Sequence, residues 1–223
     1  MSLQLIRERM LAAVNPVHGA EPPRHWQQRK SAGTRLRLVE MAIDCLVESG
    51  YASFSAAHVA QRCGVSRGAM HHHFATRMEL VAATIEHVFY KRMGAYLDAY
   101  LEALATNGDL SSVEIASELH WQSVHSREYS AYVELAVAAR TDSELAQQFV
   151  PQAQRYDTIW FDEMSRAFPQ WQAHWDDMRL ANDLTTVAHM GMLMLEPVLG
   201  QGERSARIRG LVTQMVDALY RGR

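Results

Sequence analysis

The polar residues Arg67, Gly68, His71 and His72 are spaced so that they share one side of a short helix beginning after Ser66. Arginine and histidine side chains donate hydrogen bonds to the base edges and phosphate oxygens of nucleic acids. A polar face exposed on a rigid helix is what reading of the DNA major groove requires. The first chemistry that this stretch indicates is therefore recognition of DNA.

Two short helices joined by a sharp turn are predicted to position this face. Ser55 is a good N-cap for a first helix that ends near Cys63, and Gly64 follows where the chain must turn. Ser66 caps the second helix in the same way. The pattern predicts a helix-turn-helix, with an ordinary corner between two helices as the alternative. The apolar residues of the second helix that point back at the first are Ala69, Met70 and Phe74.

A long third helix is predicted to begin at Thr76 and to end near Ala105. Thr76 and Glu79 have the spacing of a capping box, in which two side chains satisfy free backbone N–H groups of the first turn. Arg77 lies in that first turn. A cation beside the free N–H groups of a helix is suited to hold a phosphate, so Arg77 is expected to contact the DNA backbone.

The stretch from Thr34 to Leu80 resembles the DNA-binding head of the TetR family of bacterial regulators. The matching sequence is TRLRLVEMAIDCLVESGYASFSAAHVAQRCGVSRGAMHHHFATRMEL. It departs from the family pattern at His71, where a tyrosine is usual, and at Ala57, where a basic residue is frequent. The resemblance implies an all-α regulator with an N-terminal helix-turn-helix domain and a C-terminal helical domain for ligand binding and dimerisation.

The expected DNA contacts divide into two kinds. Arg67 and His71 are expected to reach base edges, with Gly68 on the same exposed face. The residues expected to hold phosphates are Ser55, Ser66, His72 and Arg77.

Composition agrees with a helical DNA-binding protein. The 223 residues are 48% hydrophobic and show no sustained period-two alternation, so an all-α fold is expected. The net charge is −3, but residues 1–80 hold ten Lys or Arg against six Asp or Glu. A basic N-terminal part on an acidic body concentrates the attraction for phosphate at one end.

Other function classes find little support. Cys45 and Cys63 fall on apolar helix faces and read as small core residues rather than a disulfide. Consecutive histidines on a helix point about 100° apart, so the run 71–73 is not expected to chelate a metal. No catalytic or cofactor motif is present, and we expect neither an enzyme nor a cofactor. No signal peptide and no bilayer span are found, which predicts a cytoplasmic protein.

Three regions are expected along the chain. Residues 1–33 form an N-terminal extension, with a short helix over 3–14 and a linker over 15–33. Residues 34–80 form the helix-turn-helix domain, and Thr34 is expected to cap its first helix. Residues 81–223 form the helical ligand-binding and dimerisation domain. Five cations before and at the start of the head suggest an arm along DNA, with a solvated tail as the alternative: Arg24, Arg29, Lys30, Arg35 and Arg37.

Five further helices are predicted over 112–126, 128–140, 143–168, 176–199 and 204–220. The last two carry long apolar stripes, which either pack into their own core or form a dimer interface. The resemblance favours a homodimer through 176–199 and 204–220, which would read the two halves of a palindromic operator. The predicted stripes are Leu180, Leu184, Val187, Gly191, Met194 or Leu195, and Val198, facing Ile208, Leu211, Val212, Met215 and Leu219.

The body is rich in aromatic and methionine residues, which line ordinary cores as well as pockets for apolar ligands. The resemblance implies an effector pocket for a small apolar or aromatic molecule. The leading hypothesis is a ligand-responsive repressor, and the alternative is a small-molecule-binding protein or enzyme whose helix-turn-helix does not read DNA. The residues expected to line the pocket are Trp121, His125, Tyr132, Trp160 and Met164.

Overall fold

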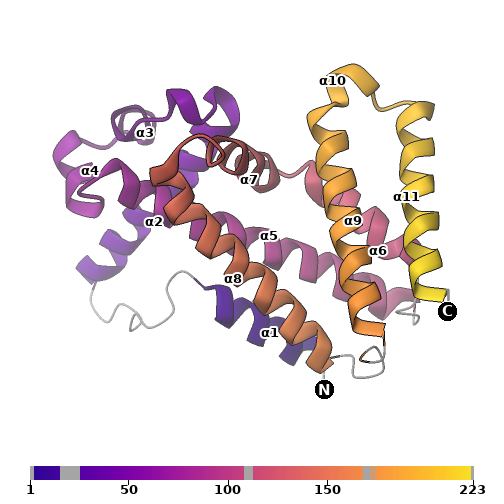
Figure 1. The fold of residues 1–223 in the computed structure, drawn as a ribbon. Coiled ribbons are helices and arrows are strands. Elements are labelled where there is room, and N and C mark those ends of the chain that lie inside the picture. The colour runs from indigo at the N-terminus through magenta and orange to yellow at the C-terminus, as the bar shows by residue number, and fades with distance from the viewer. Residues whose placement is uncertain (1–2, 16–25, 108–112, 168–171, 173, 222–223) are drawn as a thin grey trace. The chain divides into compact units, whose positions relative to one another are not determined.

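The computed structural model describes residues 3–15, 26–107, 113–167, 172 and 174–221 (Figure 1). Every regular element among them is helical, which confirms the expected all-α class. None of these described helices is long and apolar enough to cross a bilayer. The elements are α1 Leu3–Val14, α2 Trp26–Ser49, the 3-10 helix η1 Tyr51–Ser53, α3 Ala56–Cys63, α4 Arg67–His73, α5 Arg77–Asn107, α6 Val113–Val124, α7 Arg127–Ala138, α8 Ser143–Ala167, α9 Trp175–Met194, α10 Glu196–Leu199 and α11 Glu203–Arg221.

Helix α2 begins earlier than the sequence indicated. Its first residue is Trp26, so the predicted linker is wrong over residues 26–33, and Thr34 is not an N-cap. The Thr34 hydroxyl donates instead to the carbonyl of Lys30, 3.1 Å away and one turn back in the same helix. A threonine can make either bond, and the good helix formers before it outweigh the modest cost of Gly33. Residues 16–25 lie outside the described part.

The apolar face of α2 is wider than the single stripe that helical spacing predicts. Apolar residues at i, i+3, i+7, i+10 and i+11 from Leu36 would form one buried row, but its two end residues, Leu36 and Val47, are 50% and 40% exposed. The buried residues instead form two adjacent rows, which together make a wider apolar face than a single stripe: Leu38, Ala42 and Cys45, beside Val39, Ile43 and Leu46.

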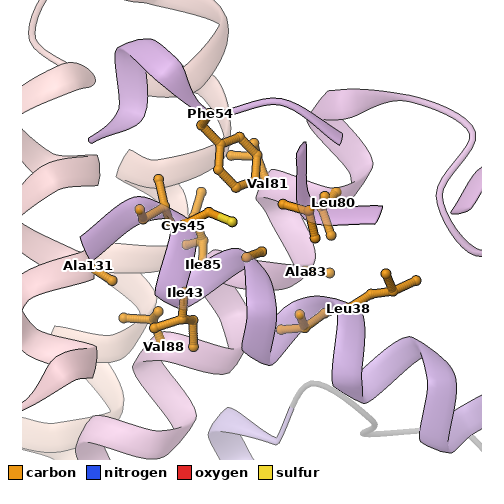
Figure 2. Packing of buried hydrophobic residues seen from close by; sticks show 14 of the residues in the cluster. Leu38, Ile43, Cys45, Phe54, Leu80, Val81, Ala83, Ile85, Val88 and Ala131 are labelled. Carbon is orange, nitrogen blue, oxygen red and sulfur yellow. The ribbon is translucent and has the colours of Figure 1, made fainter. Parts of the chain in front are cut away.

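The chain divides into two compact units. The head unit comprises Leu11–Arg92 and Arg127–Thr158, and the C-terminal unit comprises Met1–Met10, Met93–Ser126 and Ile159–Arg223. In the head unit α2 packs against α3, η1 and α7. Figure 2 shows the buried side chains of this core, among which Leu38, Ile43, Phe54, Leu80 and Val88 come from α2, the η1–α3 connection and α5.

The C-terminal unit is built on α6, α9 and α11, which pack against one another. Its last segment differs from the prediction, because the helix expected over 176–199 ends at Met194 and α10 follows after Leu195. Pro197 lies in the first turn of α10, where its missing N–H costs nothing, whereas it would break a continuous helix. Pro151, in contrast, lies inside α8 without ending it. Ser111, which has the spacing of a capping box with Glu114, lies outside the described residues.

Candidate nucleic-acid interface

The two short helices of the head begin and end as the sequence predicted. The hydroxyl oxygen of Ser55 accepts from the N–H of His58 at 3.2 Å, and that of Ser66 accepts from Ala69 at 3.1 Å. Gly64 ends α3 in the left-handed region with φ of 68°. These local bonds set the direction in which α4 leaves the turn.

Helix α4 turns its apolar and polar residues to opposite sides. Met70 and Phe74 are each only 2% exposed and belong to the core of the head unit. The polar residues predicted to read DNA lie on the outside. The exposed residues are Arg67, Gly68, His71 and His72. The arrangement has the form that base reading requires, and the individual contacts remain predictions.

Gly68 has no evident structural reason to be a glycine. Its φ is not positive, and the nearest atom to an added Cβ would be the Ser66 Oγ at 3.9 Å. In a helix interior glycine is less stable than alanine by about 1 kcal/mol. A glycine that the fold does not need, on an exposed face, fits a surface that another molecule approaches closely.

Arg77 lies in the first turn of α5, as predicted, but its guanidinium faces the protein. Its Nε donates to the carbonyl of Phe54 at 3.1 Å, and its Nη1 donates to the Tyr51 hydroxyl at 3.0 Å. The Tyr51 hydroxyl in turn donates to Asp142 at 3.2 Å. Arg77 thus ties the start of α5 to η1, a role that the sequence analysis missed, and its predicted phosphate contact is untested.

The start of α5 is capped on both sides. The Thr76 hydroxyl oxygen accepts from the N–H of Glu79 at 3.0 Å, as the capping box predicted. The Glu79 carboxylate accepts from the N–H of Ala75 at 2.9 Å, one residue earlier than in the standard box. Both bonds hold the turn between α4 and α5 in place.

Arg35 and Arg37, both assigned to the basic arm, contact distant residues of the head unit. Arg37 donates from Nη2 to the carbonyl of Cys63 at 3.0 Å and so satisfies the C-terminal end of α3. The Arg35 guanidinium lies 4.7 Å from the centre of the Phe74 ring. Arg24 lies outside the described residues. Both contacts join residues far apart in sequence, and no local pattern indicated them.

Charged side chains of α2, α5 and α7 form a network of ion pairs within the head unit. Arg127 donates to Asp44 at 2.8 Å and also to Glu40, and the Nε2 of His87 lies 2.8 Å from a Glu40 oxygen. Burial acts to raise the pKa of Glu40, but the bonds with His87 and Arg127 outweigh it and hold that pKa below its ordinary value. Burial acts to lower the pKa of Arg127, but its bonds with Glu40, Glu128 and Asp44 outweigh burial and hold that pKa above its ordinary value. Helices α2, α5 and α7 are joined in this way.

The residues predicted to bind a ligand do not form one cluster. Tyr132 lies in the head unit, where its ring contacts Phe89 and Phe149. The other four lie in the C-terminal unit. There Trp121 packs on His125 at 4.6 Å between ring centres, and Trp160 packs on Tyr96 at 5.4 Å. Met164 is buried.

A histidine pair that the sequence analysis missed lies among these rings. The Nδ1 atoms of His120 and His189 are 3.0 Å apart, and Trp121 contacts the His189 ring. His189 is fully buried, and burial together with Arg209 lowers its pKa to about 4. In the sequence His189 opens a methionine-rich run that ends at Met194, and this run does not indicate the pairing with His120. No group of three His, Cys, Asp or Glu in the described part of the chain could hold a metal ion.

The exposed face of α4, the two serine caps and the Gly64 turn together make a complete helix-turn-helix. Residues 38–84 match the sequence model of a family described as bacterial regulatory proteins, tetR family. Residues 38–84 form a helix-turn-helix domain of the TetR family. This is a family of regulators and not of enzymes, in agreement with the expectation from the sequence.

Curated relatives carry the same kind of domain. An uncharacterized HTH-type transcriptional regulator of Mycobacterium tuberculosis is 35% identical over 120 residues, which are 53% of this chain and 60% of that protein. The HTH-type transcriptional regulator CymR of Pseudomonas putida is 34% identical over 126 residues, which are 56% of this chain and 60% of CymR. The matched part of the chain thus spans about three-fifths of the length of these relatives.

Solved structures show a TetR-like fold over most of the chain. A regulator from Rhodococcus sp. attributed to the TetR family superposes with a TM-score of 0.61 at 15% identity, covering 84% of this chain and 98% of that one. A transcriptional regulator of the TerR/AcrR family from Aquifex aeolicus VF5 gives a TM-score of 0.52 at 16% identity, covering 84% and 99%. The fold therefore has an N-terminal helix-turn-helix and a helical C-terminal domain.

Proposed function

We propose that the protein is a transcriptional repressor that binds a palindromic operator as a homodimer and releases it when a small effector binds. The observation that carries the proposal is the exposed polar face of α4 within a TetR-family domain. Arg67 and His71 contact base edges. The phosphate contacts come from Ser55, Ser66, His72 and Arg77. A repressor of genomic operators works in the cytoplasm, which is part of the proposal.

A dimer through α9 and α11 is supported by the apolar residues that these helices expose. Several large apolar side chains between Leu180 and Met215 are between 51% and 76% exposed. Soluble monomers rarely expose so many apolar side chains together, so such a surface indicates an interface. An added Cβ on Gly191 would meet nothing within 4 Å, so a partner backbone has room to approach. The exposed residues are Leu180, Val187, Met194, Leu195, Val198, Leu211 and Met215.

Dimerisation also explains how the head gains specificity. One recognition helix covers only a few base pairs, whereas two heads related by a two-fold axis read both halves of a palindrome. An effector that binds better to a dimer with wrongly spaced heads shifts the population away from the DNA-binding state. Residues Trp121, His125, Trp160 and Met164 of the C-terminal unit, and Tyr132 of the head unit, are the effector contacts predicted from the sequence.

The experiment is a selection of genomic DNA fragments by the purified protein at two salt concentrations. We expect one palindrome to be enriched, with an affinity that falls steeply as salt rises, because the Lys and Arg contacts release counterions from the phosphates. The Arg67→Glu variant should fold normally and lose the enrichment. If it enriches the same palindrome as the wild type, α4 is not the recognition helix.

A further inference from the structure

The head unit contains a cavity of about 190 Å³. None of the residues that the sequence predicted to bind a ligand lies in its wall. Its walls come from the end of α1 at Val14, from α5 through Glu86 and Phe89, and from α8 through Gln152, Arg155 and Tyr156. A cavity of about 150 Å³ in another protein holds benzene. This cavity therefore has room for one six-membered ring and a small substituent.

The carboxylate of Glu86 has no hydrogen-bond donor from the described residues. Glu86 is half-buried, and burial raises the pKa of its carboxyl group, although Arg35 and Arg155 act in the opposite direction. Neither arginine forms an ion pair with it in the described part of the chain. The Glu86 oxygens are not among the fully buried polar atoms of the described residues, so water can reach them. A ligand that brings a donor would take the place of that water and make a charge-assisted hydrogen bond.

The other walls are held in place by contacts of their own. Arg155 donates from Nη2 to the carbonyl of Ala13 at 2.7 Å, which anchors the end of α1 beside the cavity. The Phe89 and Tyr156 rings lie 5.0 Å apart, and the Arg92 guanidinium lies 5.9 Å and 5.7 Å from their centres. The cavity therefore combines fixed aromatic faces with one carboxylate that accepts from no donor of the described residues.

We propose that this cavity binds a small one-ring molecule carrying an amino or hydroxyl group, whose donor faces Glu86 and whose ring lies against Phe89 and Tyr156. The inference rests on the proposed function, because it assigns this ligand as the effector. A ligand whose only polar group is a carboxylate has no hydrogen-bond donor to offer the Glu86 carboxylate. The wall from α1 precedes residues 38–84, so it lies outside the segment that the family model matches.

The test is calorimetric titration of the full-length protein with three probes that share a ring: benzylamine, phenol and benzoate. Benzylamine and phenol should bind, and benzoate should bind at least about tenfold more weakly, because only the first two can donate to Glu86. The Glu86→Met variant should lose at least about tenfold in affinity for both donors. The matched control is Glu102→Gln, an exposed carboxylate on the same helix, which should bind them as the wild type does.

Folding of Glu86→Met is checked by its melting temperature, which should stay close to that of the wild type because no hydrogen bond within the described residues is lost. If that variant does not fold, Val14→Phe fills the cavity from the α1 side and should abolish binding of both donors. The inference is overturned if benzoate binds as tightly as phenol, or if a folded cavity variant keeps the affinity of the wild type. It is also overturned if the wild type binds its operator but is not released by either donor. If no operator is found, the repressor proposal fails, and the titrations still decide whether the cavity binds these probes.

Discussion

Two pairs of helices in this molecule present opposite kinds of surface. In the head, α3 and α4 bury their apolar residues, such as Val59, Met70 and Phe74, and expose charged and polar ones. In the C-terminal unit, α9 and α11 carry two apolar faces. One face packs inside the unit, through Ala181 and Val212, and the other is exposed.

The difference agrees with the proposed role of each pair. A duplex presents phosphates and polar base edges, so a helix that reads it needs donors on its exposed side and a tight core on the other. In the proposed dimer a second copy of the chain would present the same apolar face, and association would bury both faces. The sequence left two alternatives open for the last helices, a core of their own or a dimer. The structure shows that each helix has a separate face for its own core, which leaves the second face for the proposed dimer.

The largest expected effect comes from charging the exposed apolar face. The double variant Leu211→Glu, Met215→Glu should raise the dimer dissociation constant by at least about a thousandfold, because unpaired charges would be buried. Operator affinity should fall with it, while the circular dichroism spectrum stays helical. The control is Val137→Glu, Val150→Glu, at exposed apolar sites outside α9–α11. Sedimentation velocity measures the dissociation constants of the test and the control variants. If Leu211→Glu, Met215→Glu remains dimeric, this interface is ruled out.

Removing a ring from the core of the head should have the next largest effect. Phe74→Ala should lower the free energy of unfolding by about 3–5 kcal/mol, because the side chain is buried and leaves a cavity. Leu180→Ala, at a 55% exposed site, should change the stability of the monomer by less than about 0.5 kcal/mol. Urea unfolding at concentrations where the protein is monomeric compares the two. Equal losses would mean that Leu180 is packed within its own unit.

What the sequence predicted well depends on neighbours within one turn. The caps at Ser55 and Ser66 and the turn at Gly64 need only residues three to five positions away. Thr34 was misread because a threonine can cap a helix or bond back to the turn before it. The contact of Arg37 with the carbonyl of Cys63 joins residues brought together only by the packing of α2 on α3.

The same limit explains the candidate sites. The exposed face of α4 follows from helical periodicity, so its residues were found from the sequence. The cavity beside Glu86 is made by three segments separated by about 70 residues each, and no spacing indicated it. The predicted ligand residues were chosen by type alone, and the structure distributes them between two units.

Gly64 and Gly68 lie four residues apart in the head, and replacing each by alanine should change stability in opposite directions. Gly64→Ala should destabilise the protein by about 1 kcal/mol, because φ of 68° is strained for alanine. Gly68→Ala should stabilise it by up to about 1 kcal/mol, because its backbone is ordinary and alanine favours the helix. If the backbone at Gly68 approaches DNA, the second variant should nevertheless bind the operator more weakly. Thermal unfolding and a binding titration separate the two effects, and unchanged binding by Gly68→Ala would mean that DNA does not come close there.

Ser66 combines a cap with a predicted phosphate contact, and two substitutions separate the roles. Ser66→Ala should cost about 1 kcal/mol of stability through loss of the bond to the N–H of Ala69. Ser66→Asp keeps a capping oxygen and should retain stability, but its charge should weaken operator binding by repelling phosphate. Stability and affinity are measured on the same samples. Operator binding by Ser66→Asp at the wild-type level would leave Ser66 with a capping role only.

The smallest expected effect is a dependence of stability on pH. It concerns the ion pairs of Glu40 within the head unit rather than the exposed face of α4. The pKa of Glu40 is held below its ordinary value of 4.5 in the folded protein. Its contribution is therefore present above pH 4.5 and is lost as the pH falls through the folded pKa. Because the network is partly exposed, Glu40→Gln should cost about 1 kcal/mol or less at pH 7. The loss should shrink as the pH falls through the folded pKa of Glu40, since the wild type then also loses the charge, whereas Glu102→Gln should change little over the same range. A Glu40→Gln penalty that stays constant from pH 7 to pH 3 would mean that the carboxylate charge does not hold α2 against α5 and α7.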